Sequence, residues 1–112
     1  MRSEEIARRE APIPGAYVAV FDAAHVAAPV IVRTRRAGDR IRPLGVPGHT
    51  SIKRLLITRR VARAARATQP LVVAAGEILW VPGCARSDHA LVGAATERVL
   101  VIHAEHDPRV SG

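Results

Sequence analysis

The 112-residue chain is predicted to fold as a small layered α+β domain, with mostly antiparallel strands and one main amphipathic helix. Strand-like runs of β-branched and apolar residues lie on both sides of a single segment with helical spacing. These runs occur in groups instead of alternating with helices, which favours antiparallel pairing over a parallel βαβ sheet. Hydrophobic residues make up 48% of the chain, enough for one packed core and more than a disordered basic tail carries.

The first fifteen residues are expected to be a polar lead-in or linker. Residues 1–11 are predicted to be polar or helical, with Ser3 as a helix cap, and Pro12, Pro14 and Gly15 break this segment. The domain is expected to span residues 16–104, and residues 105–112 a tail. Its first strand is predicted over residues 16–22, where β-branched and aromatic side chains alternate, and it ends at Asp22.

An arginine-rich ribbon is predicted next. Residues 30–36 alternate like a strand, so Arg33 and Arg35 share one face. Residues 37–39, Ala-Gly-Asp, are typical of a turn, because Gly38 accepts positive φ. A short extended return over residues 40–42 is then expected to run back beside residues 30–36, with its two arginines on one face.

The main helix is predicted over residues 51–60, with Thr50 or Ser51 as its N-cap. Ile52, Leu55 and Leu56 recur at helical spacing and give a narrow apolar stripe. Arg59 falls near that stripe, so either the helix ends there or the side chain lays its stem along the core. Residues 62–67 are expected to add a second short helical turn.

Strands return after Pro70. Residues 71–74 and 77–81 predict a β-hairpin around Ala75 and Gly76, and the second run ends at Pro82 and Gly83. Residues 86–95 are expected to be a loop with a short strand or turn. Residues 98–104 predict the last strand.

Basic residues are concentrated between positions 33 and 66. This segment carries eleven Arg or Lys residues and one acid, a formal charge of +10, whereas the whole chain is only +7. Clustered guanidinium groups repel one another unless a polyanion meets them, so nucleic acid is the first candidate partner. The residues predicted to bind it are Arg33, Arg35, Arg36, Arg40, Arg42, Lys53, Arg54, Arg60, Arg63 and Arg66.

Membrane insertion and secretion are not expected. No apolar run approaches the roughly 20 residues that cross a bilayer, and the first ten residues lack the apolar core of a signal peptide. The single cysteine, Cys84, cannot form an internal disulfide, which fits a reducing compartment. The cytoplasm is the expected location.

Several linked segments resemble the C-terminal domain of tRNA(Ile)-lysidine synthetase. They are VRTRRAGDRIRPLG at positions 32–45, the helix beginning at Ser51, Arg63-x-x-Arg66, PLVV at 70–73 and ILWVPG at 78–83. Their order and spacing match over about residues 17–102. The resemblance implies an α+β module, similar to a domain of the phenylalanyl-tRNA synthetase β subunit, that grips the acceptor stem of tRNA.

 The implied partner is thus tRNA, with tRNA(Ile) as the family's own substrate, and a separate catalytic chain is a possible second partner.

Two positions depart from that family's pattern. Its helix usually carries a KKLKD-like run, and the expected aspartate is Arg54 here, while the proline usual after the helix is Ala62. The family activates cytidine with ATP through an SGGxDS-type phosphate loop in another domain, and this chain contains no such run. We therefore expect the chain to bind no cofactor and to be inactive alone in ATP-dependent lysidine formation.

Other candidate sites are weaker. His103 and His106, with the acids at 105 and 107, are loosely spaced for a metal site, so no metal is expected. Ser87, Asp88 and His89 are adjacent in sequence, which favours a turn over a catalytic triad. Cys84 is expected to be a packed thiol and Trp80 a core residue.

Three interpretations stay open at this point. The chain is a tRNA-binding module that works beside a separate catalytic chain, a non-catalytic interaction domain or remnant that keeps the fold, or a fragment of a full synthetase. The sequence of the neighbouring reading frame would separate them, because a catalytic domain lacking its own C-terminal domain indicates a split enzyme.

Overall fold

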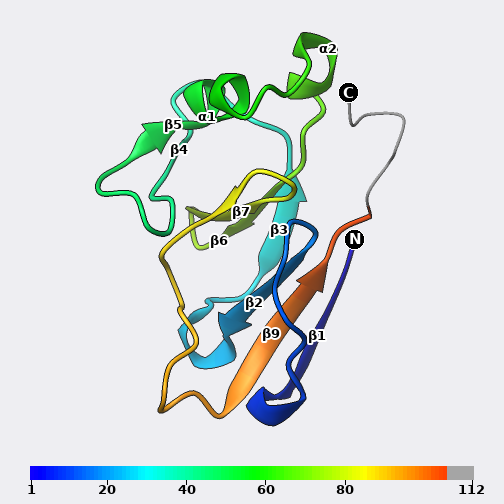
Figure 1. Ribbon diagram of the computed structural model, residues 1–112, viewed down its shortest axis with the longest axis vertical. Helices are drawn as coiled ribbons and strands as arrows, with labels where there is room; N and C mark the ends of the chain where they lie inside the picture. Colours follow the sequence, from blue (N-terminus) through cyan, green and yellow to red (C-terminus); the bar gives the residue numbers. More distant parts are fainter. Residues whose placement is uncertain (106–112) are drawn as a thin grey trace.

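A computed structural model describes residues 1–105 and shows three antiparallel sheets with two short α-helices at one end (Figure 1). The strand orders are β1-β9-β2, β3-β6-β7-β8 and β4-β5. The predicted α+β class, with mostly antiparallel strands and one main helix, is confirmed. No helix in the described part of the chain is long and apolar enough to cross a membrane.

The first sheet joins the two ends of the described chain. Its central strand β9 (Arg98–His103) pairs with β2 (Val18–Asp22) on one side and with β1 (Arg2–Ala7) on the other. The helical turn predicted for residues 1–11 is therefore wrong, apart from a 3-10 turn, η1 (Arg8–Glu10). The local helical preference of this polar segment is weak, and pairing with a distant apolar strand outweighs it.

The second sheet contains the predicted hairpin. Strands β6 (Leu71–Ala74) and β7 (Glu77–Val81) pair around Ala75 and Gly76. Both turn residues have positive φ, 49° and 77°, as a type I′ turn requires. Strand β8 (Ala85–Arg86) adds to β7, and β3 (Val30–Arg33) forms the opposite edge by pairing with β6.

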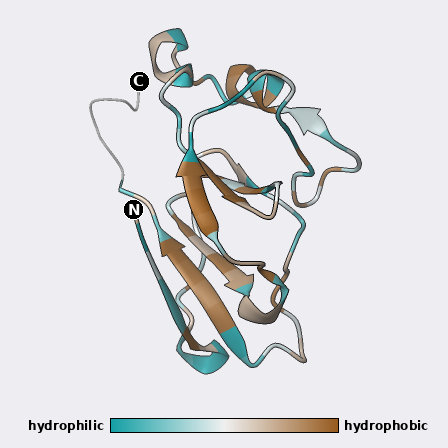
Figure 2. Cartoon of the chain, turned by 180° about the vertical axis from the view of Figure 1, so that it is seen from behind, coloured by the Kyte–Doolittle hydropathy of each residue, from teal (hydrophilic) through white to brown (hydrophobic). Residues whose placement is uncertain are grey.

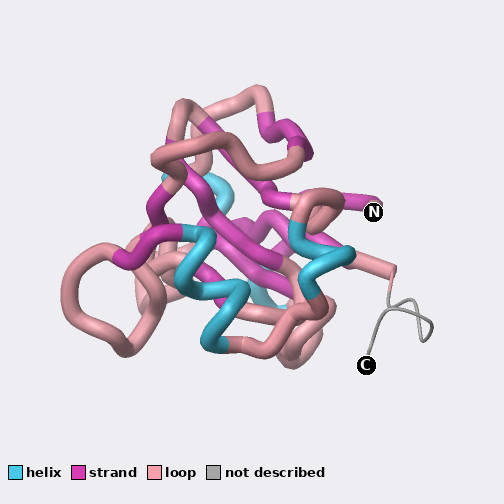
Figure 3. Tube along the Cα trace, turned by 90° about the horizontal axis from the view of Figure 1, so that it is seen from above, coloured by secondary structure: helices cyan, strands magenta, loops and turns pink. Residues whose placement is uncertain are grey.

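The predicted arginine ribbon is wrong in its pairing. Strand β4 (Arg40–Ile41) does not return beside β3 but pairs with β5 (Thr50–Ser51) in a third, two-stranded sheet. The apolar run of β3 instead lies against the equally apolar β6. The loop between β4 and β5 projects from the body of the molecule in both views (Figures 1 and 3).

Helix α1 (Ile52–Thr58) is capped at its N-terminus by Ser51, whose Oγ accepts a hydrogen bond from the backbone N–H of Arg54 at 3.0 Å. The predicted stripe of Ile52, Leu55 and Leu56 is buried. The helix ends at Arg59, one of the two alternatives left open for that residue. The expected second turn is α2 (Arg63–Arg66).

Three apolar clusters form the core, and two of them join the sheets to one another. One lies between the first and second sheets and contains Phe21, Leu79 and Trp80, so the prediction that Trp80 is a core residue is confirmed. The other packs α1 and β4 onto the second sheet through Ile41, Leu56 and their neighbours. Figure 2 shows the hydrophobic residues along the strands of the larger sheets, whereas β1 is mostly hydrophilic.

Candidate nucleic-acid interface

The ten predicted binding residues come from the end of β3, the turn after it, β4 and the two helices. These elements occupy the helix-bearing end of the molecule (Figures 1 and 3). Seven of the ten are exposed and three are half-buried. The exposed members are Arg36, Arg40, Arg42, Lys53, Arg54, Arg60 and Arg63, and the half-buried members are Arg33, Arg35 and Arg66.

Arg33 is bound within the protein. Its Nη1 and Nη2 donate to the two carboxylate oxygens of Asp39 at 2.8 and 3.0 Å, and both side chains are mostly buried. The same carboxylate accepts the backbone N–H of Arg36 at 2.7 Å. The Arg33 guanidinium holds the pKa of Asp39 below its ordinary value, with the Arg36 amide as a further cause. This pair fixes the turn that presents the neighbouring arginines.

A basic hollow lies directly beside that turn. Arg35 and Arg36 line it from the turn, and Lys53 lines it from the first turn of α1. Its volume is about 540 Å³. Backbone packing helps to form it, since the N–H of Ile52 donates to the carbonyl of Asp39 at 2.9 Å. The hollow brings Lys53 beside Arg35 and Arg36, which lie on a distant part of the chain, and its one acid, Asp39, is already neutralised by Arg33.

A second recess of about 280 Å³ lies on the other side of β4, where Arg40 and Arg42 meet His49 and Glu77. Arg42 is partly engaged, because its Nε lies 3.5 Å from a carboxylate oxygen of Asp88. Within residues 1–105, Arg40 has no carboxylate at ion-pair distance. The basic surface therefore continues past β4, with Arg40 as its free cation there.

The helices and the residues that follow them supply the remaining cations, some of which are hydrogen-bonded within the protein and some of which are not. Arg66 donates from Nε to the carbonyl of Val61 at 3.0 Å, so this side chain also closes a turn. Arg60 follows the end of α1 in the left-handed conformation, with φ 58°. Ion pairs between described residues leave Arg54, Arg60 and Arg63 unengaged. The ten residues thus divide into those that shape the surface and those that can meet a phosphate.

Arg86 is a structural arginine that the sequence analysis did not single out. Its guanidinium donates to the carbonyls of Val20 at 2.7 Å, His89 at 2.7 Å and Ser87 at 2.8 Å. It also lies 4.2 Å from the centre of the Phe21 ring. Burial lowers its pKa. Arg86 therefore joins the second sheet to the first, and its isolated position in a mixed segment gave no signal of this.

The weaker candidates do not form a catalytic or metal site in the described chain. Ser87 Oγ accepts the N–H of His89 at 3.2 Å, the geometry of a turn, as predicted. His103 lies 3.8 Å from Glu4, while His106 and residue 107 fall outside the described residues. No group of three potential metal-binding side chains occurs within residues 1–105. Cys84 is half-buried, and burial raises the pKa of its thiol.

The fold and this surface define a class of protein: a small α+β domain that presents clustered, exposed cations at one end. Residues 30–103 match the model of the TilS substrate C-terminal domain family. The chain belongs to this family, and the resemblance noted in the sequence is confirmed.

Individual proteins give the same result. The chain is 36% identical over 88 residues to the tRNA(Ile)-lysidine synthase of Caldanaerobacter subterraneus subsp. tengcongensis, covering 79% of this chain and 19% of that protein. It is 39% identical over 83 residues to the Dehalococcoides mccartyi enzyme of the same name, covering 74% and 18%. The chain thus spans less than a fifth of the length of these relatives.

Solved structures agree on the fold. A crystal structure of a TilS C-terminal domain superposes with a TM-score of 0.78 at 33% identity, covering 94% of this chain and 83% of that one. An N-terminal fragment of the phenylalanyl-tRNA synthetase β-subunit from Pyrococcus horikoshii has a TM-score of 0.62 at 17% identity, covering 75% and 26%. The second likeness confirms the expected similarity of fold.

Proposed function

We propose that this chain is a tRNA-binding module that grips the acceptor stem and serves lysidine formation by a catalytic domain outside this sequence. The observation that carries the proposal is the basic hollow, where Arg35, Arg36 and Lys53 converge without a free carboxylate among them. Arg40, Arg54, Arg60 and Arg63 extend the same charge over the helix-bearing end.

Double-stranded RNA suits this surface. The deep major groove of A-form RNA hides its base edges, so proteins recognise the duplex mainly through its shape, phosphates and 2′-hydroxyl groups. Exposed guanidinium and ammonium groups supply the phosphate contacts. Arg33 and Arg66 contribute by holding the turns that carry their neighbours, and Arg42 contributes beside its contact with Asp88.

The chemistry is assigned to a part that this sequence does not contain. The relatives that share this domain are named tRNA(Ile)-lysidine synthase and are several times longer than the matched region. We assign ATP binding to that missing part and tRNA binding in the cytoplasm to this chain. Accordingly, the chain alone with tRNA(Ile), lysine and ATP is expected to release no AMP or pyrophosphate above background.

The experiment that tests the proposal compares two nucleic acids of the same sequence. The whole chain is titrated with an RNA hairpin that reproduces the tRNA(Ile) acceptor stem, and with the corresponding DNA hairpin, at one physiological salt concentration. Recognition of A-form shape predicts tighter binding of the RNA. Equal affinity for the two hairpins would indicate generic attraction to polyanions and would contradict the proposal.

A further inference from the structure

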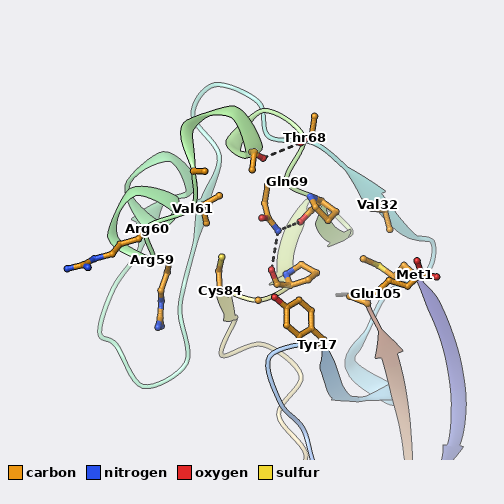
Figure 4. Close-up of a pocket in the computed structure, with 16 residues that line it drawn as sticks. Met1, Tyr17, Val32, Arg59, Arg60, Val61, Thr68, Gln69, Cys84 and Glu105 are labelled. Atoms are coloured by element: carbon orange, nitrogen blue, oxygen red, sulfur yellow. Dashed lines mark hydrogen bonds between the residues drawn. The ribbon is translucent and has the colours of Figure 1, made fainter. Parts of the chain in front are cut away.

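A cavity of about 530 Å³ opens where the two larger sheets and the helices meet (Figure 4). Two backbone hydrogen bonds fix this junction: Gly83 N–H donates to the carbonyl of Ala16 at 2.7 Å, and Ala104 N–H donates to that of Tyr17 at 2.9 Å. The volume lies within the range of about 300–1,000 Å³ typical of small-ligand sites. The cavity is separate from the basic hollow, and shares no lining residue with it.

The lining combines apolar walls with a few polar groups. Tyr17 packs so closely on Gly83 that a side-chain carbon at Gly83 would lie 3.0 Å from the tyrosine oxygen. Figure 4 shows Tyr17, Gln69 and Cys84 around one space, with Arg59 on the Cys84 side and Arg60 pointing away. The positive charge of Arg59 acts on Cys84, partly offsetting the effect of burial on its pKa.

Gln69 has a defined orientation. Its Nε2 donates to the carbonyls of Pro70 at 3.3 Å and Pro82 at 3.1 Å. Because both acceptors require the amide nitrogen, the amide oxygen must face the other way. No described residue donates a hydrogen bond to that oxygen, and every buried side-chain polar atom of residues 1–105 has a partner, so the oxygen is open to solvent. Gln69 thus offers an acceptor at the cavity.

We propose that this cavity holds one unpaired nucleotide of a bound tRNA, with its base against Tyr17 and its phosphate toward Arg59. The inference rests on the proposed function, because the duplex must first be held on the adjoining basic surface, whose member Arg60 also lines the cavity next to Arg59. Single-stranded RNA ends are recognised by stacking on aromatic side chains and by hydrogen bonds to base edges. The Gln69 oxygen can accept a hydrogen bond from the amino group of adenine, whose larger ring also offers more stacking surface than uracil.

The test compares a blunt RNA hairpin with the same hairpin carrying a short 3′ overhang of adenosines or of uridines. The adenosine overhang is expected to strengthen binding about tenfold, the contribution of one stacked base, and the uridine overhang less. Cys84, the single cysteine of the chain, reports on occupancy. The adenosine-overhang RNA should slow alkylation of this thiol by N-ethylmaleimide, and the blunt RNA should not.

Two leucine substitutions provide a matched pair of variants. Ala62→Leu places bulk in the cavity, and Ala64→Leu adds the same bulk at an exposed position of α2 that does not line it. The overhang advantage should disappear in Ala62→Leu and persist in Ala64→Leu, with thermal melts showing that both fold. If Ala62→Leu does not fold, the alkylation result on the unmodified chain decides.

Each other outcome overturns the inference in a distinguishable way. Equal affinity for blunt and overhanging hairpins would overturn it while leaving the proposed function intact. A tighter overhang complex without protection of Cys84 would place the nucleotide elsewhere on the protein. Absence of binding by either RNA would overturn the proposed function and this inference together.

Discussion

Arg33 and Asp39 form a two-point ion pair, with N–O distances of 2.8 and 3.0 Å, across the turn that leads from β3 to β4. The pair makes the first arginine of the basic segment a structural residue, and it positions Arg35 and Arg36 beside Lys53. The surface proposed to bind RNA thus depends on one internal charge pair as well as on its exposed cations.

Replacing Arg33 should therefore cost stability. We expect Arg33→Ala to lower the free energy of unfolding by about 2 kcal/mol, because it leaves the mostly buried Asp39 carboxylate with only backbone donors. Arg36→Ala, at an exposed neighbouring position, should change it by less than about 0.5 kcal/mol. Urea denaturation measures both, and equal stabilities of the two variants would contradict the structural role of Arg33.

The same pair predicts a pH dependence. The pKa of Asp39 is lowered from its ordinary 3.8, chiefly by the hydrogen bonds from Arg33. The ionised carboxylate therefore stabilises the fold above pH 3.8, and this contribution is lost as the pH falls through the lowered value. The difference in unfolding free energy between the natural chain and Asp39→Asn should be full near neutral pH and shrink in strong acid. A difference that stays constant would argue against this titration.

Arg60 allows charge and backbone strain to be separated. The backbone N–H of Arg60 donates to the carbonyl of Ile57, and the N–H of Val61 donates to the carbonyl of Leu56. This pair of hydrogen bonds is the Schellman ending of a helix, which favours glycine at position 60. We expect Arg60→Gly to be about 1 kcal/mol more stable than Arg60→Ala, because only glycine adopts positive φ without cost. Both variants lose the same charge, so both should bind RNA equally weakly. Higher thermal stability in Arg60→Ala would contradict this explanation.

Arg86 should not tolerate replacement by lysine. A lysine ammonium cannot reach the carbonyls of Val20, Ser87 and His89 with the planar geometry of guanidinium. We expect Arg86→Lys to lower the free energy of unfolding by about 2 kcal/mol. The control is Arg98→Lys, whose side chain forms an exposed pair with Glu5 and should cost less than about 1 kcal/mol. Similar losses in both variants would show that the Arg86 contacts add little.

Local signals were enough to predict much of the fold. The apolar spacing of Ile52, Leu55 and Leu56 located α1, and the Ala75–Gly76 turn located the hairpin of β6 and β7. Local signals could not predict which distant segments pair as strands. Strand β1 exists because β9 has a free edge, and β3 pairs with β6 instead of β4 because β6 offers a matching apolar strand.

The sequence predicted which segment carries the binding surface, but not how its side chains are arranged in space. Charge alone identified the cations between positions 33 and 66. It could not show that Arg33 faces Asp39, that Arg66 faces a carbonyl, or that Lys53 meets Arg35, because each depends on how loops fold back. Assignment of the exposed cations to tRNA stays a prediction.

The most direct test of the central claim compares two variants with equal loss of charge. The first, Arg35→Ala/Arg36→Ala/Lys53→Ala, removes the three cations of the basic hollow. The second, Arg2→Ala/Arg8→Ala/Arg9→Ala, removes three exposed cations of β1 and η1, none of which lines the hollow. Of these elements, η1 lies at the end of the first sheet far from the helices (Figure 1).

Both variants, shown by thermal melting to be folded, are titrated with the acceptor-stem RNA hairpin over a range of salt concentrations. Each phosphate contact contributes a slope of about 0.7–0.9 in log affinity against log salt. The account predicts that the hollow variant loses affinity steeply and flattens this slope by about two, while the β1 variant binds like the natural chain. Equal loss of affinity in the two folded variants, or undiminished binding by the hollow variant, would contradict it.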